Sequence, residues 1–313
     1  MKIFLLKCTL FVGLLIFVTL SLHFVAKKNH KFLPSKLYYA DDFKKAYNNE
    51  KFDVLVLGNS KVLSAIDKVV LERNLNQSVV QLGYSSSNVS VSKLILESFI
   101  RKNNKPKLIL FEVSWFTFNT KRTDFHDFVG DLFIKDEYLW CNYKDYNEDQ
   151  LLFKVKKAYK KSLSNLIKRT KTTYHQSYDD TFKASDPLKK SYVFDKNKFL
   201  EIFPKQLANV DKVLLRDFNE IKRICETNGI KLILFTSPED ETYSKNQKDN
   251  NKVKNIFKQS AKQSSAIHYL DYTFGGCLFD KKMEYWLKDS HHINEKNLFT
   301  EKLSNDIKKR LIK

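Results

Sequence analysis

The chain has 313 residues, 42% of them hydrophobic, which is enough for one large domain or two small ones. Lys and Arg number 55 against 36 Asp and Glu, so the formal net charge is +19. No zinc-finger spacing, glycine-rich RNA-binding signature or basic helix with heptads accompanies this charge, and we expect no nucleic-acid partner. A lysine-rich composition accounts for the charge, and the functional alternative is an anionic envelope polymer as a partner. The four cysteines lack metal-ligand spacing and predict no disulfide framework.

The stretch from residue 8 to residue 26 contains no formally charged residue. As a helix it would be about 28 Å long, close to the thickness of a bilayer's hydrocarbon core. Lysines flank it on both sides, so the positive-inside rule does not orient it. We expect an uncleaved membrane anchor at 1–27, a connecting segment at 28–50 and a folded domain at 51–313. A cleaved signal peptide is the alternative, although no small-x-small cleavage site stands near the end of the stretch.

Beyond residue 50, short apolar runs alternate with stretches of helical periodicity. The predicted strands are 53–57, 79–82, 107–113, 230–236 and 266–270. The predicted helices are 60–73, 89–102, 207–228, 252–263 and 294–311. Gly229 is well placed to end the third of these helices. Fully apolar strands that alternate with helices predict a three-layer α/β/α fold, flavodoxin-like, around a parallel sheet of about five strands.

Residues 120–206 interrupt this alternation between the third and fourth strands. The segment is rich in Tyr, Lys and Asp, and part of it has a helical, basic pattern. We expect a helical insertion that covers the site and contacts the substrate. Aromatic side chains of the kind that stack on sugar rings occur in it, namely Tyr138, Trp140, Tyr143 and Tyr146. The alternative is that they only pack the insertion.

Polar residues or glycines follow the strand ends, where open α/β sheets place their sites. Gly58-Asn59-Ser60 follows the first strand, and Gly83 follows the second. Near the C-terminus the chain reads Asp289-Ser290-His291-His292-Ile293-Asn294. A serine, a histidine and an aspartate can serve as nucleophile, base and orienting carboxylate, and the chain order of such sets varies between folds.

These motifs resemble the blocks of the SGNH/GDSL hydrolases, in which Gly58-Asn59-Ser60 matches the first block and Gly83 the second. Asp289 to His292 matches the last block, Asp-x-x-His, in a form similar to that of membrane-anchored, cell-envelope members related to glycan O-acetyltransferases and esterases. The resemblance implies Ser60 as nucleophile, His292 as base and Asp289 as the residue that orients it. It also implies an oxyanion hole built from the backbone N–H groups of Ser60 and Gly83.

The sequence departs from this family at the third block, because no Gly-x-Asn-Asp follows the third strand. Asn119 and Ser114 are the remaining candidates for a third oxyanion donor. Ser60 has an alternative role as a helix N-cap. His291 is the alternative base, and a metal site made of Asp289, His291 and His292 is disfavoured because adjacent histidines seldom reach one ion. We expect neither a metal nor a cofactor.

The resemblance implies removal or transfer of an acetyl group on an envelope glycan through an acyl-serine intermediate, with the domain outside the cytoplasm. A transferase with a single membrane segment would need a polytopic membrane acyltransferase as its partner. The alternative is a non-catalytic, membrane-tethered protein that binds or assembles glycans on a degenerate form of the same fold.

Overall fold

The computed structural model describes residues 2–29, 40–47, 50–83, 87–102, 105–115, 117–118, 210–239, 250–273 and 296–311. The chain divides into two compact units, one formed by Met1–Leu33 with His126–His175, the other by Pro34–Phe125 with Gln176–Lys313. The expected insertion at 120–206 lies outside the described residues.

Helix α1 (Lys2–Asn29) contains the expected apolar stretch. Its window Phe4–Leu22 has a mean hydropathy of 2.3, and none of it is buried. By length and composition this helix is able to cross a membrane, a property that signal sequences share.

The second unit is built on a parallel sheet of five strands in the order β2-β1-β3-β4-β5. The strands are β1 (Val54–Leu57), β2 (Val79–Gln81), β3 (Leu108–Glu112), β4 (Lys231–Thr236) and β5 (Ile267–Asp271). All four neighbouring pairs are parallel. The first three strands are buried throughout, as expected for strands covered on both faces. The predicted fold class is confirmed, and its strand order places a topological switch point between β1 and β3.

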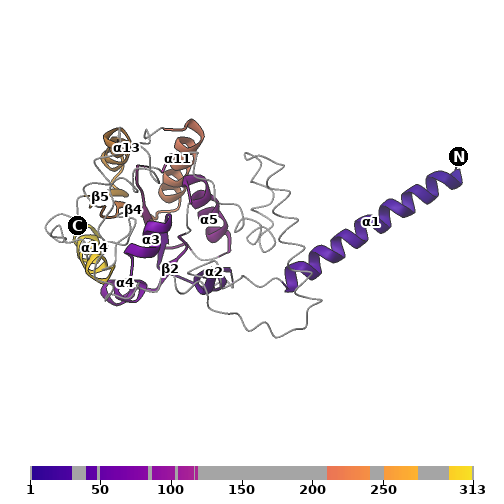
Figure 1. The fold of residues 1–313 in the computed structure, drawn as a ribbon, viewed down its shortest axis with the longest axis horizontal. Helices are drawn as coiled ribbons and strands as arrows, with labels where there is room; N and C mark the ends of the chain where they lie inside the picture. The colour runs from indigo at the N-terminus through magenta and orange to yellow at the C-terminus, as the bar shows by residue number, and fades with distance from the viewer. Residues whose placement is uncertain are drawn as a thin grey trace, which may run out of the picture. The chain divides into compact units, whose positions relative to one another are not determined.

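Helices lie on both faces of the sheet (Figure 1). They are α3 (Ser60–Ala65), α4 (Lys68–Leu75), α5 (Val89–Lys102), α11 (Lys212–Thr227), α13 (Asn250–Gln263) and α14 (Lys296–Leu311). On one face α14 packs against α3 and α4, and Phe299 joins the apolar cluster that contains Val54, Val62 and Leu110. On the other face α5 contacts α11, and the Phe218 ring of α11 meets the Phe257 ring of α13 at 5.7 Å.

The single helix predicted at 60–73 is wrong, because the structure divides it into α3 and α4. Ile66 and Asp67 have extended backbone, and the Asp67 carboxylate accepts a hydrogen bond from Val70 N–H as the N-cap of α4. The Asp67 N–H donates to the Thr300 hydroxyl of α14 at 2.8 Å. Since this aspartate caps a new helix and bonds another element, the first helix ends soon after Ser60. The other expected boundary, Gly229 after α11, is confirmed by its φ of +66°.

A short helix, α2 (Ala40–Tyr47), covers the free edge of β2. The Asp42 carboxylate accepts the backbone N–H of Gln81 at 2.8 Å and pairs with Lys68 at 2.5 Å. Phe43 and Ala46 of α2 are buried. This edge therefore offers no exposed strand for pairing with another chain.

Candidate active site

Ser60 is the first residue of α3, directly beyond the carboxyl end of β1. It is partly exposed, whereas Asn59 and Lys61 on either side are buried. The position lies at the switch point of the sheet, between β1 and β3. The chain thus presents one hydroxyl at the place where open α/β sheets bind their ligands.

The alternative role of Ser60 as a helix cap is wrong, because Asn59 is the N-cap of α3. The Asn59 side-chain oxygen accepts the Lys61 N–H at 2.8 Å. Its amide nitrogen donates to the Glu112 carboxyl oxygen Oε2 at 2.7 Å. Asn59 therefore takes over the structural task and leaves the Ser60 hydroxyl free of capping.

Two glycines allow the backbone to approach the first turn of α3 closely. Gly58 has φ of +143°, and a Cβ there would lie 2.6 Å from Val62 Cγ2 and 2.8 Å from Glu112 Cβ. A Cβ on Gly83 would lie 3.0 Å from Val62 Cγ1. The turn after β2 therefore packs directly against the helix that begins with Ser60.

The backbone N–H groups of Ser60 and Gly83 have no hydrogen-bond partner among the residues that the structure describes. Both follow strand ends on the same rim, and both can donate to an acceptor bound there. Ser114 differs, because its N–H donates to the Thr117 hydroxyl at 2.8 Å. Its own hydroxyl is buried and has no partner within the described part of the chain. As a third donor, Ser114 can therefore offer only its side chain.

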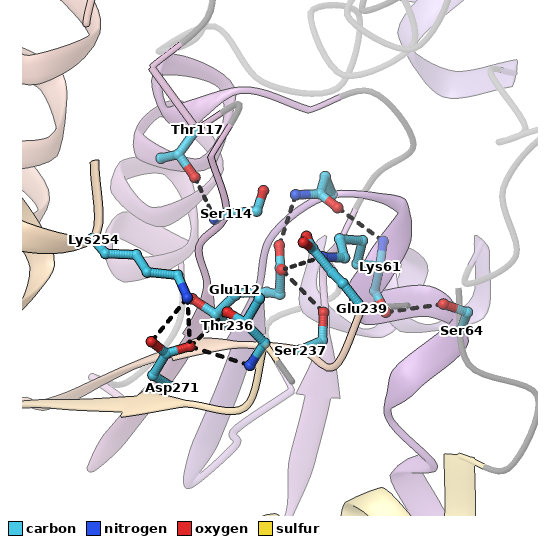
Figure 2. A network of polar contacts seen from close by, with 12 residues as sticks. Lys61, Ser64, Glu112, Ser114, Thr117, Thr236, Ser237, Glu239, Lys254 and Asp271 are labelled. Atoms are coloured by element: carbon cyan, nitrogen blue, oxygen red, sulfur yellow. Dashed lines mark hydrogen bonds and ion pairs between the residues drawn. The ribbon is translucent and has the colours of Figure 1, made fainter. Parts of the chain in front are cut away.

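Next to Ser60 in the chain, Lys61 forms a buried charge cluster with Glu112 and Glu239 (Figure 2). Each of these side chains is at most 1% exposed. The Lys61 ammonium bonds the Glu239 carboxylate and lies 3.9 Å from Glu112 Oε1. The Ser237 hydroxyl donates to the same Glu112 oxygen at 3.1 Å. The cluster links α3 with the carboxyl ends of β3 and β4.

Strand periodicity explains how the cluster forms. Glu112 lies two residues after Leu110, so it faces the same side of the sheet, the side covered by α3. Ser237 stands in the same relation to Phe235 on the neighbouring strand. Complete burial raises the pKa of the Glu112 carboxyl, although Lys61 and the Ser237 hydroxyl act in the opposite direction. Glu112 thus holds its proton to higher pH than an exposed glutamate does.

The rim continues onto β5, where one polar contact joins the segments that follow β4 and β5 and two more hold Asp271 at the end of β5. Glu239 N–H donates to the Thr273 carbonyl at 2.8 Å, and the Thr273 hydroxyl donates to Asp271 at 2.6 Å. Lys254 pairs with Asp271 at 3.0 Å. Partial burial opposes ionisation of the Asp271 carboxyl, but Thr273 and Lys254 outweigh it and lower its pKa. The cluster next to Ser60 is therefore fixed from β1 across to β5.

The remaining site residues predicted from the sequence are Asn119, Asp289 and His292, with His291 as the alternative base, and all four lie outside the described residues. Sequence reasoning missed the buried cluster. Its signal was present, since Glu112 ends an otherwise apolar strand and Lys61 follows the serine directly. A charged residue at such a buried position needs a partner, but the sequence does not say which one.

No protein-family model matches the sequence, and no curated protein shows a significant similarity to it. Among solved structures, it is similar to a proposed acylhydrolase from Bacteroides fragilis at 11% identity and a TM-score of 0.42, over 86% of this chain and 94% of that one. It is similar to a GDSL-like lipase from Bacteroides thetaiotaomicron at 11% identity and a TM-score of 0.40, over 86% and 98% of the chains. It is also similar to a family two carbohydrate esterase from Clostridium thermocellum in complex with cellohexaose, at 10% identity and a TM-score of 0.39, over 84% of this chain and 64% of that one. Similarity at this level concerns the fold alone.

Proposed function

We propose that this chain is a membrane-anchored SGNH-type esterase or O-acyltransferase that removes or transfers acetyl groups on an envelope glycan through an acyl-Ser60 intermediate. The observation that carries the proposal is the presentation of Ser60 at the switch point of the sheet. The residue is partly exposed, while its N–H and that of Gly83 are unengaged among the described residues. In this proposal the nucleophile and its two oxyanion donors share one rim.

In the proposed reaction, Ser60 Oγ attacks the ester carbonyl while His292 accepts the hydroxyl proton. The ester C–O bond then breaks, and His292 returns the proton to the departing alcohol. Asp289 orients the imidazole and stabilises its protonated form. Water or a sugar hydroxyl next attacks the acyl-Ser60 carbonyl while His292 accepts its proton, and His292 returns that proton to Ser60 Oγ as the acyl–Oγ bond breaks. Water makes the protein an esterase, and a sugar hydroxyl makes it a transferase.

The proposed placement has the domain outside the cytoplasm, with α1 as a single-pass anchor. The apolar length of α1 and the net charge of +19 support a membrane-bound protein with an anionic polymer as its partner. For the transferase, a polytopic membrane acyltransferase would deliver the acetyl groups.

A serine-reactive fluorophosphonate tests the proposal on the full-length chain in detergent micelles. We expect one adduct, located on Ser60 by peptide mass spectrometry and lost in Ser60→Ala and His292→Ala. Ser64→Ala is the matched control, because Ser64 lies one turn later on α3 and its hydroxyl bonds the Lys61 carbonyl. That variant should label like the wild type. A folded wild-type protein without an adduct would contradict the proposal and favour the non-catalytic binding protein.

A further inference from the structure

The charge cluster meets the first turn of α3 at two side chains, Lys61 within the helix and Asn59 at its N-cap. The two ends of the Asn59 amide have different tasks, since the oxygen caps Lys61 N–H and the nitrogen donates to Glu112 Oε2. The amide cannot rotate by half a turn, because its nitrogen would then face the Lys61 N–H. The orientation of the cap therefore depends on an acceptor at the Glu112 position.

Glu112 is itself held from three sides. Its other oxygen, Oε1, accepts from Ser237 at 3.1 Å and faces the Lys61 ammonium at 3.9 Å. Its Cβ lies against Gly58, whose φ of +143° sets the direction in which the chain leaves β1. A fully buried carboxyl group with this many constraints has little freedom to move.

We propose that Glu112 is a positioning residue for Ser60 and acts through Asn59. Its oxygen Oε2 fixes the Asn59 amide, the amide fixes the first turn of α3, and that turn carries the Ser60 hydroxyl and N–H. Lys61, Ser237 and Glu239 keep the carboxyl group in place. The inference rests on the proposed role of Ser60 as nucleophile. An error of about 1 Å in such a group costs on the order of 100-fold in rate, which makes the positioning measurable.

The inference is tested by exchanging the amide of Asn59 and the carboxyl group of Glu112 between the two positions. Asn59→Asp keeps a capping oxygen but points a carboxylate at Glu112. Glu112→Gln points an amide nitrogen at the Asn59 nitrogen, or turns it towards Lys61. The double variant Asn59→Asp with Glu112→Gln restores the hydrogen bond between the two side chains with donor and acceptor exchanged, and the introduced carboxylate still caps the Lys61 N–H. The amide nitrogen of the introduced glutamine then donates to the introduced carboxylate, and its amide oxygen remains for Ser237 and Lys61.

The readout is the rate of fluorophosphonate labelling on Ser60, together with kcat and KM for p-nitrophenyl acetate, all on the full-length chain. We expect each single variant to lower the labelling rate and kcat by about 10- to 100-fold while KM changes by less than about twofold. The double variant should recover to within about threefold of the wild type. Asp217→Asn is the control, a buried carboxylate that bonds a serine and a lysine between α5 and α11.

Single variants that fold and label at the wild-type rate would overturn the inference. So would a double variant that labels no faster than the single ones. If the single variants do not fold, the double variant alone tests the inference. Because its Asn59→Asp and Glu112→Gln side chains bond each other again, we expect it to fold and to be labelled on Ser60. A wild-type protein that is not labelled on Ser60 removes the proposed function first and the positioning role with it, so the two failures are distinguishable.

Discussion

Two groups of side chains, each with a lysine, a carboxyl group and a serine, lie in different places in this domain. Lys61, Glu112 and Ser237 meet at the strand ends next to Ser60, with side chains of Lys61 and Glu112 exposed by 1% and 0%. Lys93, Asp217 and Ser90 meet between α5 and α11, where Lys93 remains 18% exposed. The first group fixes the turn that carries a proposed nucleophile, whereas the second joins two helices. The two groups have similar chemistry, and they differ in where they lie, one next to the proposed nucleophile and the other between two helices.

The largest effect is expected from Lys61→Met, which leaves Glu112 and Glu239 buried without their cation. Breaking a buried pair in this way costs about 3–5 kcal/mol of unfolding free energy. Urea unfolding followed by circular dichroism measures it. Lys93→Met is the matched control and should cost about 1–2 kcal/mol, because this lysine is partly exposed and Arg216 stays 3.4 Å from Asp217. Equal losses in the two variants would remove the distinction between the pairs.

A smaller loss, about 2–3 kcal/mol, is expected for Gly58→Ala. The new Cβ would collide with Val62 and Glu112, and φ of +143° is strained for alanine. Gly229→Ala is the control, since φ there is +66° but nothing lies within 4 Å of the added Cβ. It should cost about 1–2 kcal/mol. Thermal unfolding of both variants compares them, and a Gly58 variant as stable as the Gly229 variant would argue against tight packing next to Ser60.

Asp217→Asn should lower the unfolding free energy by about 1–3 kcal/mol and leave the Ser60 labelling rate within about twofold of the wild type. The Cys225 thiol on α11 serves as the reporter of local opening. It is 0% exposed, and burial raises its pKa to about 12, so it reacts only when the helix opens. We expect faster thiol labelling in the variant without a change at Ser60. A fall in Ser60 labelling would show that both pairs serve the site.

The smallest effect concerns pH. Because burial raises the pKa of Glu112 in the folded state, its contribution to stability is present below pH ~4.5 and is lost as pH rises through the folded-state pKa. Glu112→Gln removes this dependence. The wild type should therefore lose stability relative to the variant as pH rises above ~4.5, which urea unfolding at a series of pH values measures. A difference that stays constant with pH would mean that the carboxyl titrates as it does in the unfolded chain.

The sheet could be predicted from the sequence because a wholly apolar composition indicates a strand buried on both faces. Runs such as Val54–Leu57 and Leu108–Glu112 are almost wholly apolar, and burial on both faces follows from that. The prediction failed at Ile66 and Asp67, where one predicted helix became two. The cap at Asp67 competes with helix continuation, and the contact from Thr300 that favours the cap comes from 233 residues away.

By itself, the sequence determined the apolar N-terminal helix, the alternation of strands and helices, and the placement of Ser60 and Gly83 beyond strand ends. These follow from local composition and period. Only the tertiary structure decided that Asn59 donates to Glu112, 53 residues away, and that Lys61 pairs with Glu239, 178 residues away. The physical reason is that a buried charge must find a partner, and which partner it finds depends on strand order and on the side of the sheet each residue faces.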